Sequence, residues 1–119
     1  MNNFETLFKS PKALEMGWKL KRIIESHFEN IEGTMMGGAK VKLILYSRNG
    51  KNNVLCGIQE AANDSCMLYV HHLKELHHER LKFSGKGKHA KRIKFSNIEE
   101  IVEEDIWWLL SEVDRNVPY

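Results

Sequence analysis

The chain has few cysteines, no long apolar run, no internal repeat and no low-complexity segment. Cys56 and Cys66 fit neither a disulfide scaffold nor a zinc site, and both lie in apolar segments, so we expect two buried, reduced thiols. The longest apolar run is Ile106–Leu110, whereas a membrane-spanning helix needs about 20 apolar residues. No basic stretch followed by an apolar run opens the chain, so we expect no secretory signal and a cytoplasmic location.

Motifs of common enzymes are absent as well. The chain has no G-x-S-x-G elbow, no HExxH motif, no CxxC pair and no Walker spacing, which argues for binding rather than catalysis. Its 18 basic and 16 acidic residues leave a net charge of +2, too small to indicate nucleic-acid binding.

The remaining composition is that of one ordinary domain. The 119 residues are 42% hydrophobic and 29% charged, so we expect a single domain over 1–119 with one core. Ser10-Pro11 opens a long helix that we predict to run to about Asn30, because serine is a good N-cap and proline suits the first helical position. A short turn over Phe4–Phe8 is predicted to pack back on the core.

Alternating and branched apolar residues predict strands at Lys40–Tyr46, Asn53–Ile58, Cys66–His71 and Lys91–Phe95. His72–Leu81 is predicted to be a short helix and Phe83–Ala90 a loop. The expected fold is therefore α+β, a mainly antiparallel sheet of about five strands with an N-terminal and a C-terminal helix packed on it.

A hairpin centred near Ala62 would pair Cys56 with Leu68 and Ile58 with Cys66. One face of the sheet then carries Val54, Cys56, Ile58, Cys66, Leu68 and Val70. The other carries Leu55, Met67 and Tyr69, and also Ile44 and Tyr46 if the register of the neighbouring strand follows. This second face is too apolar for plain solvent exposure, so we expect a helix, the N-terminal segment, a second subunit or a ligand to cover it.

Ser96 and Glu99 match a capping box ahead of a closing helix that runs to about Arg115. On its helical wheel, Trp107 and Trp108 fall on opposite flanks of the apolar stripe, so at least one indole is expected to be partly exposed. Together with Tyr69 they form a hypothetical interface, and we expect a weak homodimer. The alternative is that both tryptophans are boundary residues of the core.

A glycine- and lysine-rich stretch over 82–94 offers a candidate anion site through Lys86, Lys88, Lys91 and Arg92. The alternative is a solvated turn whose lysines protect a sheet edge. Candidate metal ligands are Glu100, Glu103, Glu104, His72 and His78. The acids equally suit the first turn of a helix, and the histidines a polar helix surface.

Residues 85–101, GKGKHAKRIKFSNIEEI, resemble the C-terminal signature of the YdhG-like family. In that signature a Gly-Lys loop leads into an Arg/His-Ile-Lys-Phe strand and a Ser-x-x-acid-acid-Ile turn. Residues 55–58 resemble the second strand of the same family, and the order of elements agrees over about 14–116. The resemblance implies a small bacterial α+β domain of unknown function, and for some members an iron-chaperone role that would make iron the ligand.

Three hypotheses for function therefore remain open. The first is a non-enzymatic binding protein of the YdhG-like family that binds iron. The second is a protein-interaction or homodimeric module that uses the Trp107/Trp108 helix. The third is anion or nucleotide binding at Gly85–Lys94. No membrane partner is expected.

Overall fold

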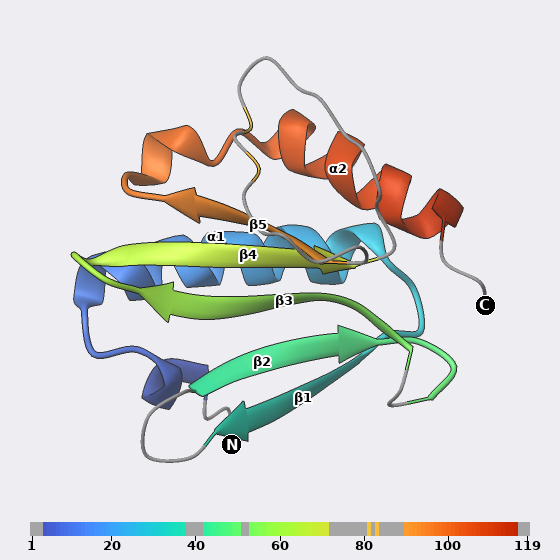
Figure 1. Cartoon of the computed structure of the whole chain (residues 1–119), viewed down its shortest axis with the longest axis horizontal. Helices are drawn as coiled ribbons and strands as arrows, with labels where there is room; N and C mark the ends of the chain where they lie inside the picture. The colour runs from blue at the N-terminus through green and yellow to red at the C-terminus, as the bar shows by residue number, and fades with distance from the viewer. Residues whose placement is uncertain are drawn as a thin grey trace.

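The computed structural model describes residues 4–37, 42–50, 53–71, 81, 83 and 90–116. Figure 1 shows the helices α1 and α2 beside a twisted sheet, which confirms the expected α+β fold. In chain order the elements are η1 (Phe4–Leu7), α1 (Pro11–His27), β1 (Glu32–Gly37), β2 (Lys42–Ser47), β3 (Val54–Ala61), β4 (Ser65–His71), β5 (Ala90–Phe95), η2 (Ile98–Glu100) and α2 (Glu103–Asn116).

The sheet is an antiparallel meander in which each strand pairs with the next, in the order β1-β2-β3-β4-β5. All four predicted strands are confirmed, and β1 is an additional strand that the sequence did not indicate. Its glycines interrupt the apolar pattern, but Gly33 suits this edge position. A Cβ there would lie 3.1 Å from Cε1 of Tyr46 and 3.2 Å from Cδ1 of Ile44, so glycine leaves room for the Tyr46 ring.

Helix α1 begins as predicted. Pro11 takes the first position and the Ser10 hydroxyl accepts a hydrogen bond from the Ala13 amide at 3.2 Å. The helix ends earlier than the predicted Asn30, because Phe28 is extended and Asn30 has a φ of 57°. Ahead of the helix, the turn η1 buries Phe4 and Leu7 in the core, as expected.

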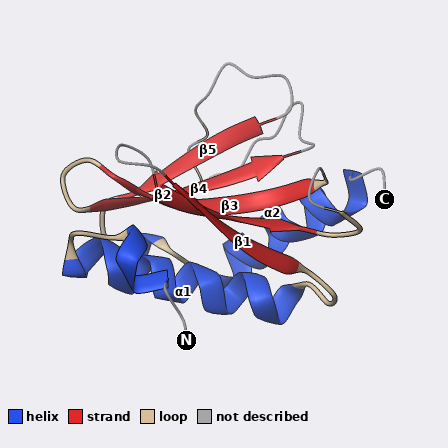
Figure 2. Cartoon of the chain, turned by 90° about the horizontal axis from the view of Figure 1, so that it is seen from below, coloured by secondary structure: helices blue, strands red, loops and turns tan. Residues whose placement is uncertain are grey.

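Both helices pack on one face of the sheet (Figure 2). Burial alternates accordingly along the strands. On β5, Ile93 is buried while its neighbours Arg92 and Lys94 are exposed, and on β4 Leu68 is buried while Tyr69 is only half-buried. We call the two sides the covered face and the open face. No described helix packs on the open face.

The β3–β4 hairpin turns two positions away from the predicted register. Cys56 pairs with Val70 and Ile58 with Leu68, so the predicted pairs of Cys56 with Leu68 and Ile58 with Cys66 are wrong. Residues 62–64 form the turn, with Asn63 and Asp64 in the left-handed region at φ values of 61° and 58°. Because side chains alternate between the two faces with a period of two, a shift of two positions leaves every residue on its predicted face. The residues predicted to share a face with Cys56 therefore still share it.

The prediction that Ile44, Tyr46 and Leu55 share the second face is wrong. The register shifts between Tyr46 and Ser47, so that Tyr46 pairs with Cys56 while Ser47 pairs with Val54. Leu55 is the extra residue of this bulge and is fully buried. Because a slip of one residue exchanges the two faces of a strand, the bulge turns Ile44 and Tyr46 onto the covered face. The Tyr46 hydroxyl there donates to Glu25 of α1 at 3.0 Å.

The closing segment begins one residue later than the sequence suggested. Glu100, not Glu99, reaches back, and its Oε1 accepts from the amides of Ser96 at 2.6 Å and Asn97 at 3.3 Å. Helix α2 ends close to the predicted Arg115. No helix within the described ranges is long and apolar enough to cross a bilayer. The predicted helix at His72–Leu81 and loop at Phe83–Ala90 lie almost wholly outside the described residues, although Leu81 is buried in the core.

Candidate functional site

The open face brings together the largest group of partly exposed apolar side chains on the sheet. Alternation places one residue of every two on this side of each strand. The side chains that carry its chemistry are Leu43, Leu45, Gln59, Met67, Tyr69, Arg92 and Lys94. The first five are half-buried and the two cations are exposed.

The centre of the open face is filled by a leucine lying over a glycine. A Cβ at Gly57 would come within 2.8 Å of Cδ2 of Leu45 and 2.9 Å of the Ile44 carbonyl oxygen. Beside this contact, the Tyr69 hydroxyl donates a hydrogen bond to Oε1 of Gln59 on the next strand. The centre is therefore apolar, and its phenol already has an acceptor.

The candidate anion residues do not converge within the described part of the chain. Lys86 and Lys88 lie outside it. Lys91 pairs with Val70 and Arg92 with Tyr69, and because successive residues of a strand point to opposite faces, the two cations are on different sides of the sheet. Arg92 thus belongs to the open face, with Lys94 two positions further along β5.

The candidate metal ligands that the structure describes do not form one site either. Glu100 is engaged by two backbone amides, whereas Glu103 and Glu104 are exposed in the first turn of α2. His72 and His78 lie outside the described residues. Among the residues that the structure does describe, no three His, Cys, Asp or Glu side chains gather as a metal site.

Trp107 and Trp108 lie on opposite flanks of α2, as the helical wheel predicted. Trp107 is 39% exposed, while Trp108 is half-buried against the core. Since α2 packs on the covered face and Tyr69 lies on the open face, the three aromatic residues do not form one patch. The predicted joint interface of Tyr69 with the tryptophans therefore splits into two surfaces.

A histidine outside the candidate metal ligands joins the C-terminal end of α1 to the middle of α2. The ring of His27 packs edge-on against Trp107 at 4.5 Å between centroids, and its Nε2 lies 3.1 Å from the Ser111 hydroxyl. Ser111 also donates to the Trp107 carbonyl at 2.8 Å. Nδ1 of His27 is buried without a hydrogen-bond partner, which is unfavourable for a polar atom. The serine hydroxyl is engaged by the backbone, so we regard this cluster as a helix–helix contact.

The pH dependence of stability should report on His27. Burial lowers the pKa of His27 below its usual 6.5, and the nearby Asp114 opposes this only in part. The folded state therefore takes up a proton less readily than the unfolded state, so the contribution of His27 to stability is full above pH 6.5 and is lost as the pH falls below it. As the pH is lowered from 7.5 to 5.5, we expect the urea concentration at the midpoint of unfolding to decrease. The decrease should be smaller in His27→Phe, which keeps the ring contacts. An equal decrease in the two proteins would contradict this.

The two thiols are buried as the sequence predicted. Cys56 and Cys66 are both 0% exposed and unbridged. Burial raises the pKa of both thiols, that of Cys66 to about 12, so almost no thiolate is present near neutral pH.

Both thiols should accordingly be inert in the native protein. At pH 8 we expect a colorimetric thiol reagent to modify neither cysteine over minutes, and to modify both once the protein is unfolded in guanidinium. Rapid native modification would show that the covered face opens readily.

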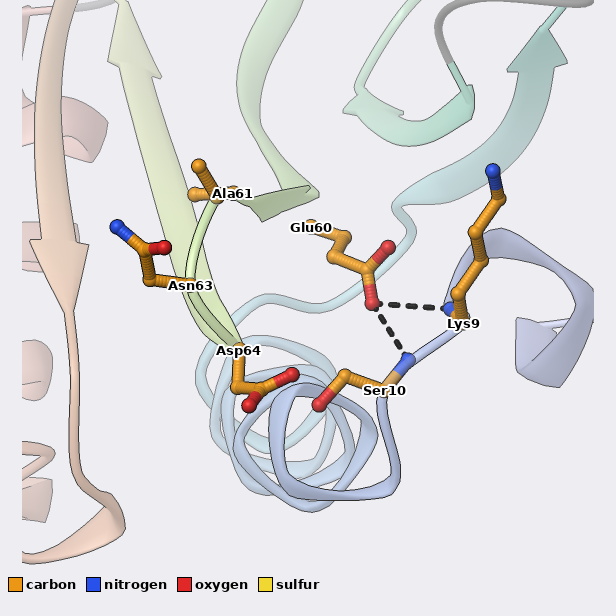
Figure 3. A pocket seen from close by; sticks show the side chains of 7 residues that line it. Lys9, Ser10, Glu60, Ala61, Asn63 and Asp64 are labelled. Carbon is orange, nitrogen blue, oxygen red and sulfur yellow. Dashed lines mark hydrogen bonds between the residues drawn. The ribbon is translucent and has the colours of Figure 1, made fainter.

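The hollow between the start of α1 and the β3–β4 turn contains the carboxylate of Glu60. Oε2 of Glu60 accepts from the amides of Lys9 at 2.9 Å and Ser10 at 2.8 Å (Figure 3). Asn63 and Asp64 form the other wall. A carboxylate that accepts two amide hydrogen bonds is already in place where an anionic ligand would bind, so this feature joins α1 to the sheet.

Three open-face residues were not predicted as part of this surface, namely Leu43, Leu45 and Lys94. Their signal was present in the period-two alternation of Lys42–Ser47 and Lys91–Phe95. It was obscured because Ile44 and Tyr46 are equally apolar, so alternation alone does not say which set faces the helices.

Comparisons with protein-family models, with curated proteins and with solved structures give no match to this chain. Its function is therefore argued from its own residues.

Proposed function

We propose that this protein is a non-enzymatic protein-interaction module whose binding surface is the open face of its sheet. One observation carries the proposal. Both described helices cover the same face, and the other face retains half-buried Leu43, Leu45, Met67 and Tyr69. Contiguous exposed apolar side chains bordered by polar ones are typical of interaction sites.

Charge distribution supports this choice over an anion site. Arg92 and Lys94 are on the open face while Lys91 is on the covered face, so the described cations border an apolar surface and do not surround one point. Interfaces combine an apolar centre with a polar rim in this way.

Site-specific photocrosslinking tests the proposal. A photoreactive phenylalanine analogue replaces Leu43 on the open face, and a matched control carries it at Arg22, which is exposed on α1. After irradiation in the cells that produce the protein, we expect one discrete adduct from position 43. An excess of wild-type protein without the photoreactive group should compete for the partner and suppress this adduct. The same excess of the Met67→Glu variant should not suppress it.

Failure to form an adduct at position 43, or formation of the same adduct from position 22, would contradict an interface on the open face. Circular dichroism of each variant checks that the fold is intact.

A further inference from the structure

The outer edge of β1 offers backbone hydrogen-bonding groups to a further strand. β1 ends the sheet beside β2, and Figure 1 shows it as the lowest strand. In an antiparallel strand, every second residue turns its N–H and C=O toward the same neighbour, so half of the six residues of β1 direct these groups away from β2. Within the described part of the chain, no strand and no backbone hydrogen bond meets that side.

The two outer strands of the sheet differ in how they resist such pairing. β5 carries Lys91, Arg92 and Lys94, and cations on an outer strand are one way in which proteins prevent edge-to-edge association. β1 has no lysine, arginine or proline, and its single charge is Glu32 at the first position. Its register with β2 runs over six pairs without a bulge. β1 is therefore a regular edge that lacks these protections.

The side chain at the middle of β1 suits a copy of itself. Met35 is the Cα partner of the buried Ile44, so it lies on the helix side of the sheet, where it is 41% exposed. The positions two residues away on the same face are Gly33 and Gly37, so Met35 is the one side chain that β1 carries there. A two-fold axis at Met35 would pair two β1 strands in antiparallel, set each Gly33 opposite Gly37 and bring the two methionines together.

The same axis keeps the charges of this edge apart. Glu32 is three residues from Met35, so the two Glu32 residues would be roughly 20 Å apart along the strands, well beyond the Debye length of about 8 Å at physiological salt. We infer that two copies of this chain associate through antiparallel pairing of their β1 strands, with Met35 packed against Met35 across the axis.

This interface is small, because only residues 33–37 of each chain pair. Interfaces below about 1,200 Å² belong to weak complexes, so we expect a Kd of roughly 10 μM to 1 mM. Because the axis is perpendicular to the sheet, the open faces of both copies would lie on the same side. The pairing of β1 does not depend on what the open face binds.

Sedimentation velocity of the full chain tests the inference. Over about 10 μM to 1 mM protein, we expect the mean mass to rise from that of one chain toward that of two. Met35→Lys sets like charges directly opposite each other and should weaken association by about tenfold or more. Ala62→Lys makes the same charge change at an exposed position of the β3–β4 turn and should leave association unchanged.

A pair of opposite charges tests the position of the axis. Met35→Lys and Met35→Glu should each be monomeric alone, and their mixture should form a mixed dimer, because lysine would then face glutamate. In the wild-type protein, dilution should shift the amide resonances of Glu32–Gly37 and leave those of Ser65–His71 in place. Circular dichroism of each variant checks that the fold is intact, and the dilution experiment needs no variant.

A monomer at every concentration would overturn the inference. So would association that Met35→Lys leaves intact, or a mixture of the two charged variants that stays monomeric. If β1 instead pairs with a strand of a different protein, dilution of the pure chain will leave its amide resonances unchanged, which is also a negative result. Failure of the photocrosslink at position 43 bears only on the open face, so the two proposals fail separately.

Discussion

Replacing Leu68 by alanine is expected to lower the free energy of unfolding by about 2–5 kcal/mol. Leu68 is 0% exposed and belongs to the cluster that α1 and α2 cover. Truncation removes buried methyl groups and leaves a cavity that a packed helix–sheet interface closes only in part. Urea denaturation followed by circular dichroism measures the change.

The adjacent Met67 is a matched control, because it is on the same strand but the opposite face. Met67→Ala should cost about 1 kcal/mol or less, since the side chain is only half-buried. Equal losses at the two positions would contradict the one-sided packing on which the open face depends.

Adding a methyl group at Gly57 is expected to destabilise the fold by about 1–3 kcal/mol. In Gly57→Ala the new Cβ would lie 2.9 Å from the Ile44 carbonyl oxygen and 2.8 Å from Cδ2 of Leu45. The leucine can rotate away, but the carbonyl belongs to the neighbouring strand, so β2 and β3 must separate locally. Thermal and urea unfolding of the variant measure the loss.

Gly33→Ala provides the comparison in the same sheet. The atoms nearest its Cβ would be side-chain atoms of Tyr46 and Ile44, at 3.1 and 3.2 Å, and alanine also reduces the entropy of the unfolded chain. We expect a change of about 0.5 kcal/mol or less. If Gly57→Ala were equally mild, the close approach of β2 to β3 at Ile44 would be wrong.

The features that local chemistry specifies were predictable from the amino acids. Ser10 and Pro11 start α1 where predicted, because a capping hydroxyl and a fixed proline φ act within one turn. Four strands and the placement of Trp107 and Trp108 on opposite flanks of α2 also followed from period-two and helical spacing.

The strand faces were only half predictable. Cys56, Ile58 and Leu68 point inward as expected, since the hairpin register moved without changing parity. Ile44 and Tyr46 were placed on the wrong face, because one bulge between Tyr46 and Ser47 exchanges the sides of β2. A bulge is selected by which side chains can pack on α1, and that contact joins residues distant in sequence.

The open face itself emerges only in three dimensions. From the sequence, Met67 and Tyr69 formed a second apolar face with an unknown cover, and Arg92 belonged to a basic loop. The folded chain places both helices on one side and sets Arg92 and Lys94 beside Tyr69 and Met67. Periodicity is a property of neighbouring residues and is readable along the chain. Which layer covers which face depends on how separate elements bury their apolar sides against one another.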